Sequence, residues 1–65
     1  MRIQVNGDWH EVEVGELAAA LAVLGYADAR VSTALNGEFV PVQARAATVL
    51  KDGDRVEVLA PMQGG

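Results

Sequence analysis

The sequence predicts an α+β fold in which a mixed sheet of four to five strands packs over a single helix. Two features lead to this prediction: alternating apolar and polar residues mark several short strands, and one Ala- and Leu-rich segment has helical spacing. Two strands precede the helix and three follow it, an order that favours one sheet with a helix on one face. The 65 residues, 51% hydrophobic and 22% charged, make one small folded domain.

The first two strands are expected to form a hairpin. Apolar and polar residues alternate over residues 1–6, the period-two pattern of a strand with one buried face. The segment Asn6-Gly7-Asp8 supplies turn residues that tolerate positive φ. Extended structure is expected to resume over 9–14, with Val12 and Val14 on one side.

Residues 16–24 form the predicted helix. Apolar residues recur there at helical spacing within an Ala-rich stretch. Gly15 is expected at the N-cap, and Gly25 suits the left-handed position that follows the last turn.

Three strands are expected after the helix, over 31–36, 38–40 and 55–60. The dipeptide Asn36-Gly37 is typical of a hairpin turn between the first two of them. Residues 42–50 show no clean period and are expected to form a connection with room for one helical turn. The predicted core packs three helix leucines against apolar strand residues: Leu17, Leu21 and Leu24 against Ile3, Val5, Val12, Val14, Leu35, Val56 and Val58.

Charge and cysteine content argue against several classes of function. Five Lys and Arg residues against nine Asp and Glu residues give a net charge of −4, which disfavours nucleic acid and anionic membranes and favours a protein partner. The absence of cysteine excludes a disulfide framework and a cysteine-based zinc or redox motif. Because no segment has the pattern of a signal peptide or a membrane span, we expect a cytoplasmic protein.

Side chains that could carry catalysis are few. His10 is the one histidine and Ser32 the one serine, so a metal site or a catalytic triad lacks partners, and His10 is expected to be an exposed strand residue. Asp52-Gly53-Asp54 is similar to part of a calcium loop but lacks its ligand spacing, and a turn explains it better. Glu11 and Glu13 are expected on a solvated face. We therefore expect neither a metal site nor an enzyme active site.

The most unusual feature is the end of the sequence, Pro61-Met62-Gln63-Gly64-Gly65. We expect a folded domain over residues 1–60 and a flexible tail over 61–65 that can reach about 17 Å. Two terminal residues without side chains can pass through a channel too narrow for any Cβ, and the reactive group that they present is a carboxylate. Terminal glycines also occur by chance in flexible ends, so their position and the fold together support this interpretation.

The sequence resembles the ThiS family, the sulfur carriers of thiamine biosynthesis, over essentially its whole length. The resemblance depends on residues 34–41 (ALNGEFVP), residues 50–58 (LKDGDRVEV) and the terminal Gly64-Gly65. It implies a β-grasp, ubiquitin-like domain whose Gly65 carboxylate is adenylated with ATP by an activating enzyme resembling ThiF. A sulfur donor, such as a cysteine desulfurase, then provides the sulfur of a thiocarboxylate, which passes to the thiazole synthase ThiG. The chain itself would bind no cofactor and would be a substrate of enzymes rather than an enzyme.

One further hypothesis concerns the outer face of the last strand. If Val56 and Val58 face the helix, with Ala60 on the same side, Leu59 must face outward, next to Ser32 if the third and fifth strands adjoin. We expect Leu59 to form, with the adjacent Pro61 and Met62, an apolar docking strip for the partner enzyme. The alternative is an ordinary exposed residue at this position.

Two other functions remain open at the level of the sequence. One is a carrier for another sulfur-transfer pathway, such as molybdopterin synthesis, amino-acid synthesis or tRNA thiolation, or a protein modifier that shares the fold and the activation step. The other is a β-grasp interaction module in which Gly64-Gly65 is only a frayed end. Deletion of Gly65 distinguishes the second alternative, because a scaffold would keep its binding and a carrier would lose its function.

Overall fold

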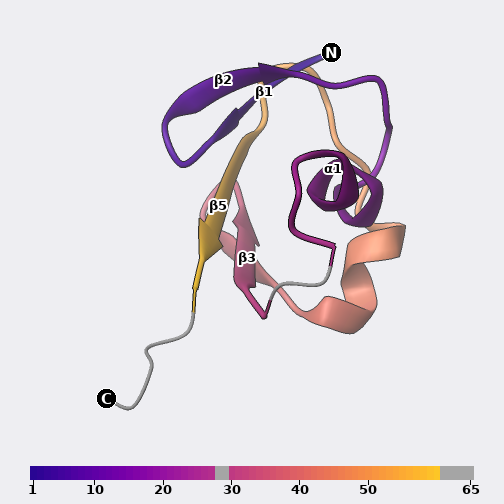
Figure 1. The fold of residues 1–65 in the computed structure, drawn as a ribbon, viewed down its shortest axis with the longest axis vertical. Coiled ribbons are helices and arrows are strands. Elements are labelled where there is room, and N and C mark those ends of the chain that lie inside the picture. The colour runs from indigo at the N-terminus through magenta and orange to yellow at the C-terminus, as the bar shows by residue number, and fades with distance from the viewer. Residues whose placement is uncertain (28–29, 61–65) are drawn as a thin grey trace.

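The computed structural model describes residues 1–27 and 30–60 of the chain. Along these residues lie β1 (Arg2–Val5), β2 (Asp8–Glu11), α1 (Leu17–Val23), β3 (Ser32–Leu35), β4 (Glu38–Val40), the 3₁₀ helix η1 (Val42–Ala47) and β5 (Arg55–Leu59). The described strands form one sheet in the order β2-β1-β5-β3-β4. Strand β1 is parallel to β5, whereas β2, β3 and β4 pair antiparallel with their neighbours. Both helices lie on the same side of this sheet, so its opposite face is uncovered (Figure 1).

The hairpin β1–β2 confirms the first predicted turn but is shorter than predicted. Asn6 and Gly7 both have positive φ, 51° and 89°, as a two-residue type I′ turn requires. Strand β2 ends at Glu11, although strand structure was expected to Val14. The backbones of Val12 and Met1 still exchange two hydrogen bonds, at 2.9 and 2.8 Å.

His10 is half-buried, not exposed as the sequence predicted. It pairs with Ile3 across the β1–β2 ladder, and directly opposite residues of an antiparallel pair share a face. Because Ile3 is fully buried, His10 lies at the inner side of the sheet edge. The prediction was wrong because the exposure of His10 depends on the residue opposite it in the ladder, and that residue, Ile3, belongs to the core.

Helix α1 and its N-cap each begin one residue later than predicted. The N-cap is Glu16, whose carboxylate accepts a hydrogen bond from the Ala19 N–H; Gly15, the predicted cap, has no side chain that could do so. A carboxylate at this position also interacts favourably with the positive end of the helix dipole. At the other end Gly25 has a φ of 94°, and the N–H groups of Gly25 and Tyr26 donate to Ala22 and Leu21 carbonyls. This Schellman motif confirms the predicted role of Gly25.

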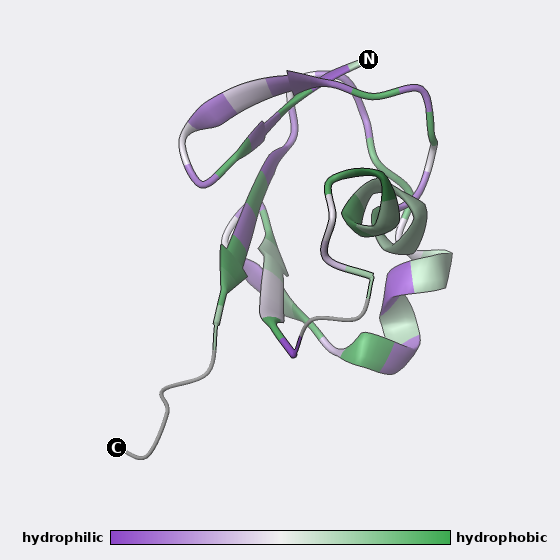
Figure 2. Ribbon diagram, in the orientation of Figure 1, coloured by the Kyte–Doolittle hydropathy of each residue, from purple (hydrophilic) through white to green (hydrophobic). Residues whose placement is uncertain are grey.

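The core lies between α1 and the inner face of the sheet, as predicted, with three additions, Ala20, Val40 and Leu50. Its buried apolar residues are Ile3, Val5, Val12, Leu17, Ala20, Leu21, Val40, Leu50, Val56 and Val58. Val14, Leu24 and Leu35 were predicted in the core and are only partly buried at its margin. Figure 2 shows hydrophobic residues along most of α1, which suits a helix that packs against a sheet on one side and η1 on another.

Leu50 is buried because the connection after β4 returns to the start of α1. The N–H of Leu17 donates to the Thr48 carbonyl, and the N–H of Leu50 donates to the Gly15 carbonyl. The expected helical turn in this connection is η1, which is tied to β3 through Arg45. The Arg45 side chain donates to the Thr33 hydroxyl at 2.9 Å and to the Val31 carbonyl at 2.6 Å.

Candidate functional site

The candidate site is the end of β5, because the predicted tail follows this strand. Strand β5 is the middle strand of the sheet and is paired on both sides, with β1 and with β3. Val56 and Val58 are buried, whereas Arg55, Glu57 and Leu59 alternate with them on the exposed face. Pairing therefore supports the strand as far as Leu59. Ala60, predicted on the inner side with the two valines, lies beyond the strand and is exposed.

Leu59 faces outward next to Ser32, as predicted from the alternation. It pairs with Ser32 across the β5–β3 ladder and is 65% exposed. On the far side of β3, Phe39 pairs with Ala34 and is 69% exposed. We call these four residues the outer strip: two large apolar side chains on β5 and β4, with two small ones on β3 between them.

The sequence analysis did not include Phe39 in the docking strip, although a signal was present. Val40 is buried, so its neighbour Phe39 must point to the opposite face of the sheet. Recognising this required the order of the strands, which places β4 beside β3 and hence Phe39 on the same face as Leu59. Pro61 and Met62, the other predicted members of the strip, lie outside the described residues.

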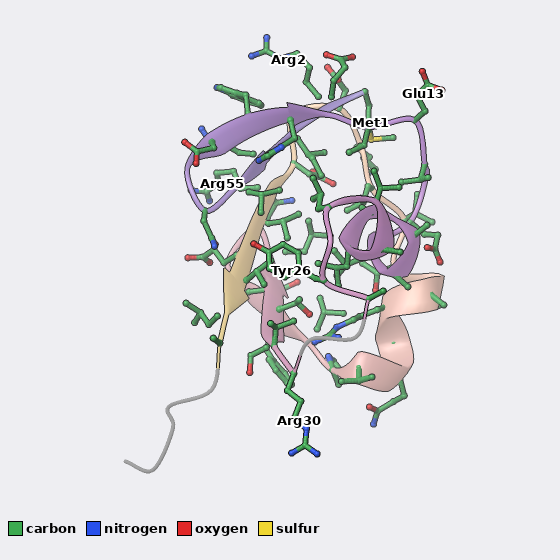
Figure 3. All side chains as sticks on the ribbon, viewed as in Figure 1. Met1, Arg2, Glu13, Tyr26, Arg30 and Arg55 are labelled. Atoms are coloured by element: carbon green, nitrogen blue, oxygen red, sulfur yellow. The ribbon has the colours of Figure 1, made fainter. Side chains whose placement is uncertain are left out.

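The remaining outer face of the sheet is charged and aromatic. The Arg2 guanidinium lies over the Trp9 ring, 4.6 Å from its centroid, in a cation–π contact. Arg55 pairs with Gln4 on the neighbouring strand, and Arg2 and Arg55 extend from the same half of the molecule, while Arg30 extends from the opposite end (Figure 3). The outer face is thus apolar towards the end of β5, whereas towards its start it carries charges of both signs, with Arg2 directly opposite Glu11 and Arg55 on the same face as Glu57.

Two asparagine side chains hold β5 in place. The Asn6 carboxamide donates to the Val58 carbonyl at 2.9 Å and accepts from the Val58 N–H at 2.8 Å. Asn36 accepts from the Arg55 N–H through its side chain at 2.9 Å and donates to the Arg55 carbonyl through its backbone N–H at 2.8 Å. Each asparagine opens a hairpin turn with a φ of 51°. The two turns therefore fix the two ends of β5.

The other candidate residues have structural roles. Asp52 accepts from the Arg2 N–H at 2.7 Å, and Asp54 accepts from the Lys51 N–H at 2.8 Å and from the Asn36 side chain at 3.0 Å. These carboxylates therefore serve the turn before β5, as predicted. Within residues 1–27 and 30–60, no three His, Cys, Asp or Glu side chains lie close enough together to hold a metal ion.

His10 and Ser32, for which a catalytic role was not expected, lie apart in the sheet. His10 is on the edge strand β2, while Ser32 is on β3, with β1 and β5 between them. Glu11 and Glu13 are exposed, as expected. None of the helices in the part of the chain that the structure describes has the length and apolar character needed to cross a membrane.

A shallow groove lies between α1 and η1, on the opposite side of the sheet from the outer strip. Its lining consists mainly of small apolar residues, with Tyr26 and Arg45 as the polar members. The Arg45 side chain is already engaged by Thr33 and by the Val31 carbonyl. Among residues 1–27 and 30–60, the lining contains no carboxylate or histidine.

The predicted reactive residues cannot be placed in this geometry. Gln63, Gly64 and Gly65 lie outside the described residues, so the tail over 61–65 and the domain boundary at residue 60 remain predictions. What the structure provides is the position of the residues that precede the tail: Leu59 on the outer face and Ala60 at the end of the paired strand.

The topology and the site define a class of protein. A mixed sheet with two parallel central strands, β1 and β5, crossed on one face by a single helix after the first hairpin, is the β-grasp fold of ubiquitin-like domains. The sequence model of the ThiS family matches residues 3–65, and the chain belongs to this family.

Two solved structures are similar over the full length of the chain. The crystal structure of the thiamine biosynthesis protein ThiS from Geobacter metallireducens is 39% identical, with a TM-score of 0.85 and complete coverage of both chains. The NMR solution structure of a thiamine biosynthesis protein from the same organism is 38% identical, with a TM-score of 0.76, and the match covers 100% of this chain and 88% of that one. A search of curated proteins found no match.

Proposed function

We propose that this protein is a sulfur carrier for the synthesis of the thiazole of thiamine. The Gly65 carboxylate is adenylated with ATP by a ThiF-like enzyme, and a sulfur donor such as a cysteine desulfurase supplies the sulfur that converts it to a thiocarboxylate. The thiocarboxylate then gives its sulfur to a ThiG-like thiazole synthase in the cytoplasm. The protein is a substrate of these enzymes, and ATP is bound by the activating enzyme.

The observation that supports this proposal most strongly is the match to the ThiS family as far as residue 65, so that it includes the terminal Gly64-Gly65. The likeness to a thiamine biosynthesis protein ThiS covers both chains completely.

The chemistry of the terminus explains why an activating enzyme is needed. A free carboxylate is a poor electrophile, and joining it to AMP creates an acyl-adenylate with a good leaving group. Attack by sulfide on the acyl carbon releases AMP and leaves sulfur in place of one carboxylate oxygen. Attack by a desulfurase persulfide also releases AMP but first forms an acyl disulfide, from which a thiol reductant releases the thiocarboxylate. A thiocarboxylate sulfur is a strong nucleophile, so a chain with no cysteine can still deliver sulfur.

The outer strip supports docking to the partner enzymes. Leu59 and Phe39 are exposed apolar side chains on one face, and Leu59 lies two residues before the predicted tail. Exposed apolar patches near a reactive group commonly mark protein interaction sites. We propose that the strip, with Pro61 and Met62, binds the activating enzyme while the tail carries its carboxylate to the bound ATP.

An intact-mass measurement tests the carrier chemistry. The purified protein is incubated with the activating enzyme, ATP and a sulfide source, and the expected product is heavier by the difference between sulfur and oxygen, with the change on Gly65. The chain lacking Gly65 is the control. An unchanged mass for the full chain would refute the carrier proposal, and modification at another residue would refute the assigned site. Thiazole formation by a purified thiazole synthase separates the thiamine pathway from other sulfur-transfer pathways.

A substitution in the outer strip tests docking separately. Leu59→Glu places a charge on the strip and should reduce carrier-dependent ATP–pyrophosphate exchange by the activating enzyme without unfolding the domain, because Leu59 is 65% exposed. The matched control is Val42→Glu, which introduces the same charge at a side chain 67% exposed on the helix side. Equal exchange by the two variants would exclude the strip as the docking surface.

A further inference from the structure

We propose that Asn6 is a positioning residue that sets the direction in which the tail leaves the domain. This inference rests on the proposed function, because it assigns Asn6 a part in presenting the terminal carboxylate to the activating enzyme. Asn6 lies far from the terminus in the sequence, yet its side chain binds Val58, two residues before the last described residue, Ala60.

The Asn6 carboxamide makes the hydrogen bonds to β5 that the backbone of β1 would make if this strand continued past Asn6. The parallel ladder between β1 and β5 ends when the Asn6 backbone N–H donates to the Val56 carbonyl at 2.9 Å. The next groups of β5 that face β1 belong to Val58, but the chain turns away at Gly7 with a φ of 89°. The side-chain amide donates one N–H to the Val58 carbonyl, and its oxygen accepts from the Val58 N–H, as the groups of a backbone would.

The contact between Asn6 and Val58 determines how many residues of β5 are hydrogen-bonded along both edges of the strand. On the β3 side, pairing extends to Leu59, opposite Ser32. On the β1 side, backbone pairing ends at Val56, and the Asn6 side chain extends it to Val58. Without this side chain the last three residues of β5 would be held from one edge, and the end of the strand could pivot about its ladder with β3.

A pivot at this point matters because a reactive group at the end of a short tail must meet a fixed partner. Misplacing a reacting group by about 1 Å can cost up to about a hundredfold in rate. The outer strip would remain in place, since Leu59 stays paired with Ser32. We therefore expect loss of the Asn6 side chain to lower kcat of adenylation more than it raises KM for the carrier.

The chain contains a matched control in Asn36. Both asparagines precede a glycine, both have a φ of 51°, and both bind the backbone of β5. They differ in position: Asn36 binds Arg55 at the start of β5, while Asn6 binds Val58 near its end. Replacement by glycine, which tolerates this φ without strain, removes each side chain and leaves each turn intact.

The experiment compares Asn6→Gly with Asn36→Gly in carrier-dependent ATP–pyrophosphate exchange, at a temperature where circular dichroism finds both variants folded. Asn6→Gly should lower kcat about tenfold, and Asn36→Gly should stay within about twofold of the unmodified protein. Equal losses in the two variants, or no loss in Asn6→Gly, would overturn the inference. Failure of the unmodified protein to support exchange would instead count against the proposed function.

Two further measurements test the same contact, the first of them without the enzyme. Amide hydrogen exchange at Val58 should accelerate in Asn6→Gly relative to the slowest core amides, and should not do so in Asn36→Gly. Asn6→Asp keeps an acceptor for the Val58 N–H but sets a carboxylate against the Val58 carbonyl, so its kcat should lie between those of Asn6→Gly and the unmodified protein. Unchanged exchange at Val58 in Asn6→Gly would contradict the proposed contact.

Discussion

Leu21 is the position at which the stability of the domain can be tested most directly. Its side chain is 3% exposed, in α1 where the helix packs against the sheet. Truncation to alanine removes buried methyl groups and leaves a cavity, at a cost of about 2–5 kcal/mol. A domain of this length has a total stability of roughly 3–10 kcal/mol. The single substitution is therefore expected to remove between about a fifth and all of the stability.

Urea denaturation followed by far-UV circular dichroism measures this effect. With a slope of about 1 kcal/mol per molar urea, the midpoint of Leu21→Ala should fall by about 2 M or more, or the variant should be unfolded in buffer. Val23→Ala is the control: Val23 lies in the same helix, is 62% exposed, and its truncation should change the stability by at most about 0.5 kcal/mol. If both variants unfolded at the midpoint of the parent protein, the assignment of the core would be wrong.

Three other substitutions test particular contacts, each by the same denaturation measurement. Thr33→Val deprives the Val40 carbonyl and the Arg45 side chain of their buried partner and should cost about 1–3 kcal/mol; an unchanged midpoint would mean that water replaces the hydroxyl. Glu16→Ala removes the N-cap of α1 and should cost about 0.5–2 kcal/mol, and a stabilised variant would contradict the assigned cap. Gly37→Ala should cost about 1–2 kcal/mol from backbone strain alone, because φ is 88° and no atom lies within 4 Å of the new Cβ; a much larger loss would point to a steric clash instead.

Most of the fold could be predicted because local signals agree with the tertiary structure. The two Asn-Gly turns each require positive φ at two successive residues, and these residue types adopt it most readily. The alternation in β5 correctly predicted that Val56 and Val58 are buried and that Leu59 faces outward. Such signals lie within a few residues of one another, so they can be recognised without the rest of the chain.

The features that the sequence analysis missed depend on long-range contacts. Leu50 belongs to the core because its own N–H donates to the Gly15 carbonyl and the nearby Thr48 carbonyl accepts from Leu17. These partners lie more than thirty residues earlier, and no periodicity in the sequence indicates the contact. The position of Phe39 on the outer strip depends on the strand order. The Asn6–Val58 contact joins residues separated by 52 positions. In the sequence Asn6 indicates only a turn, because nothing local reveals what its carboxamide binds.

The turn at Asn6-Gly7 also affects how fast the protein is chemically degraded by deamidation. In an Asn-Gly pair the following backbone nitrogen can attack the side-chain carbonyl carbon and expel ammonia, which closes a succinimide ring. Hydrolysis of this ring leaves aspartate or isoaspartate, one reason why asparagine is a thermolabile residue. Ring closure needs a free carboxamide, but in the folded protein Val58 holds that of Asn6 from two sides. The two hydrogen bonds to Val58 therefore protect the Asn6 carboxamide from deamidation in the folded protein. In a preparation that spends time unfolded, Asn6 will convert to acidic forms, and aspartate at this position would set a carboxylate against the Val58 carbonyl.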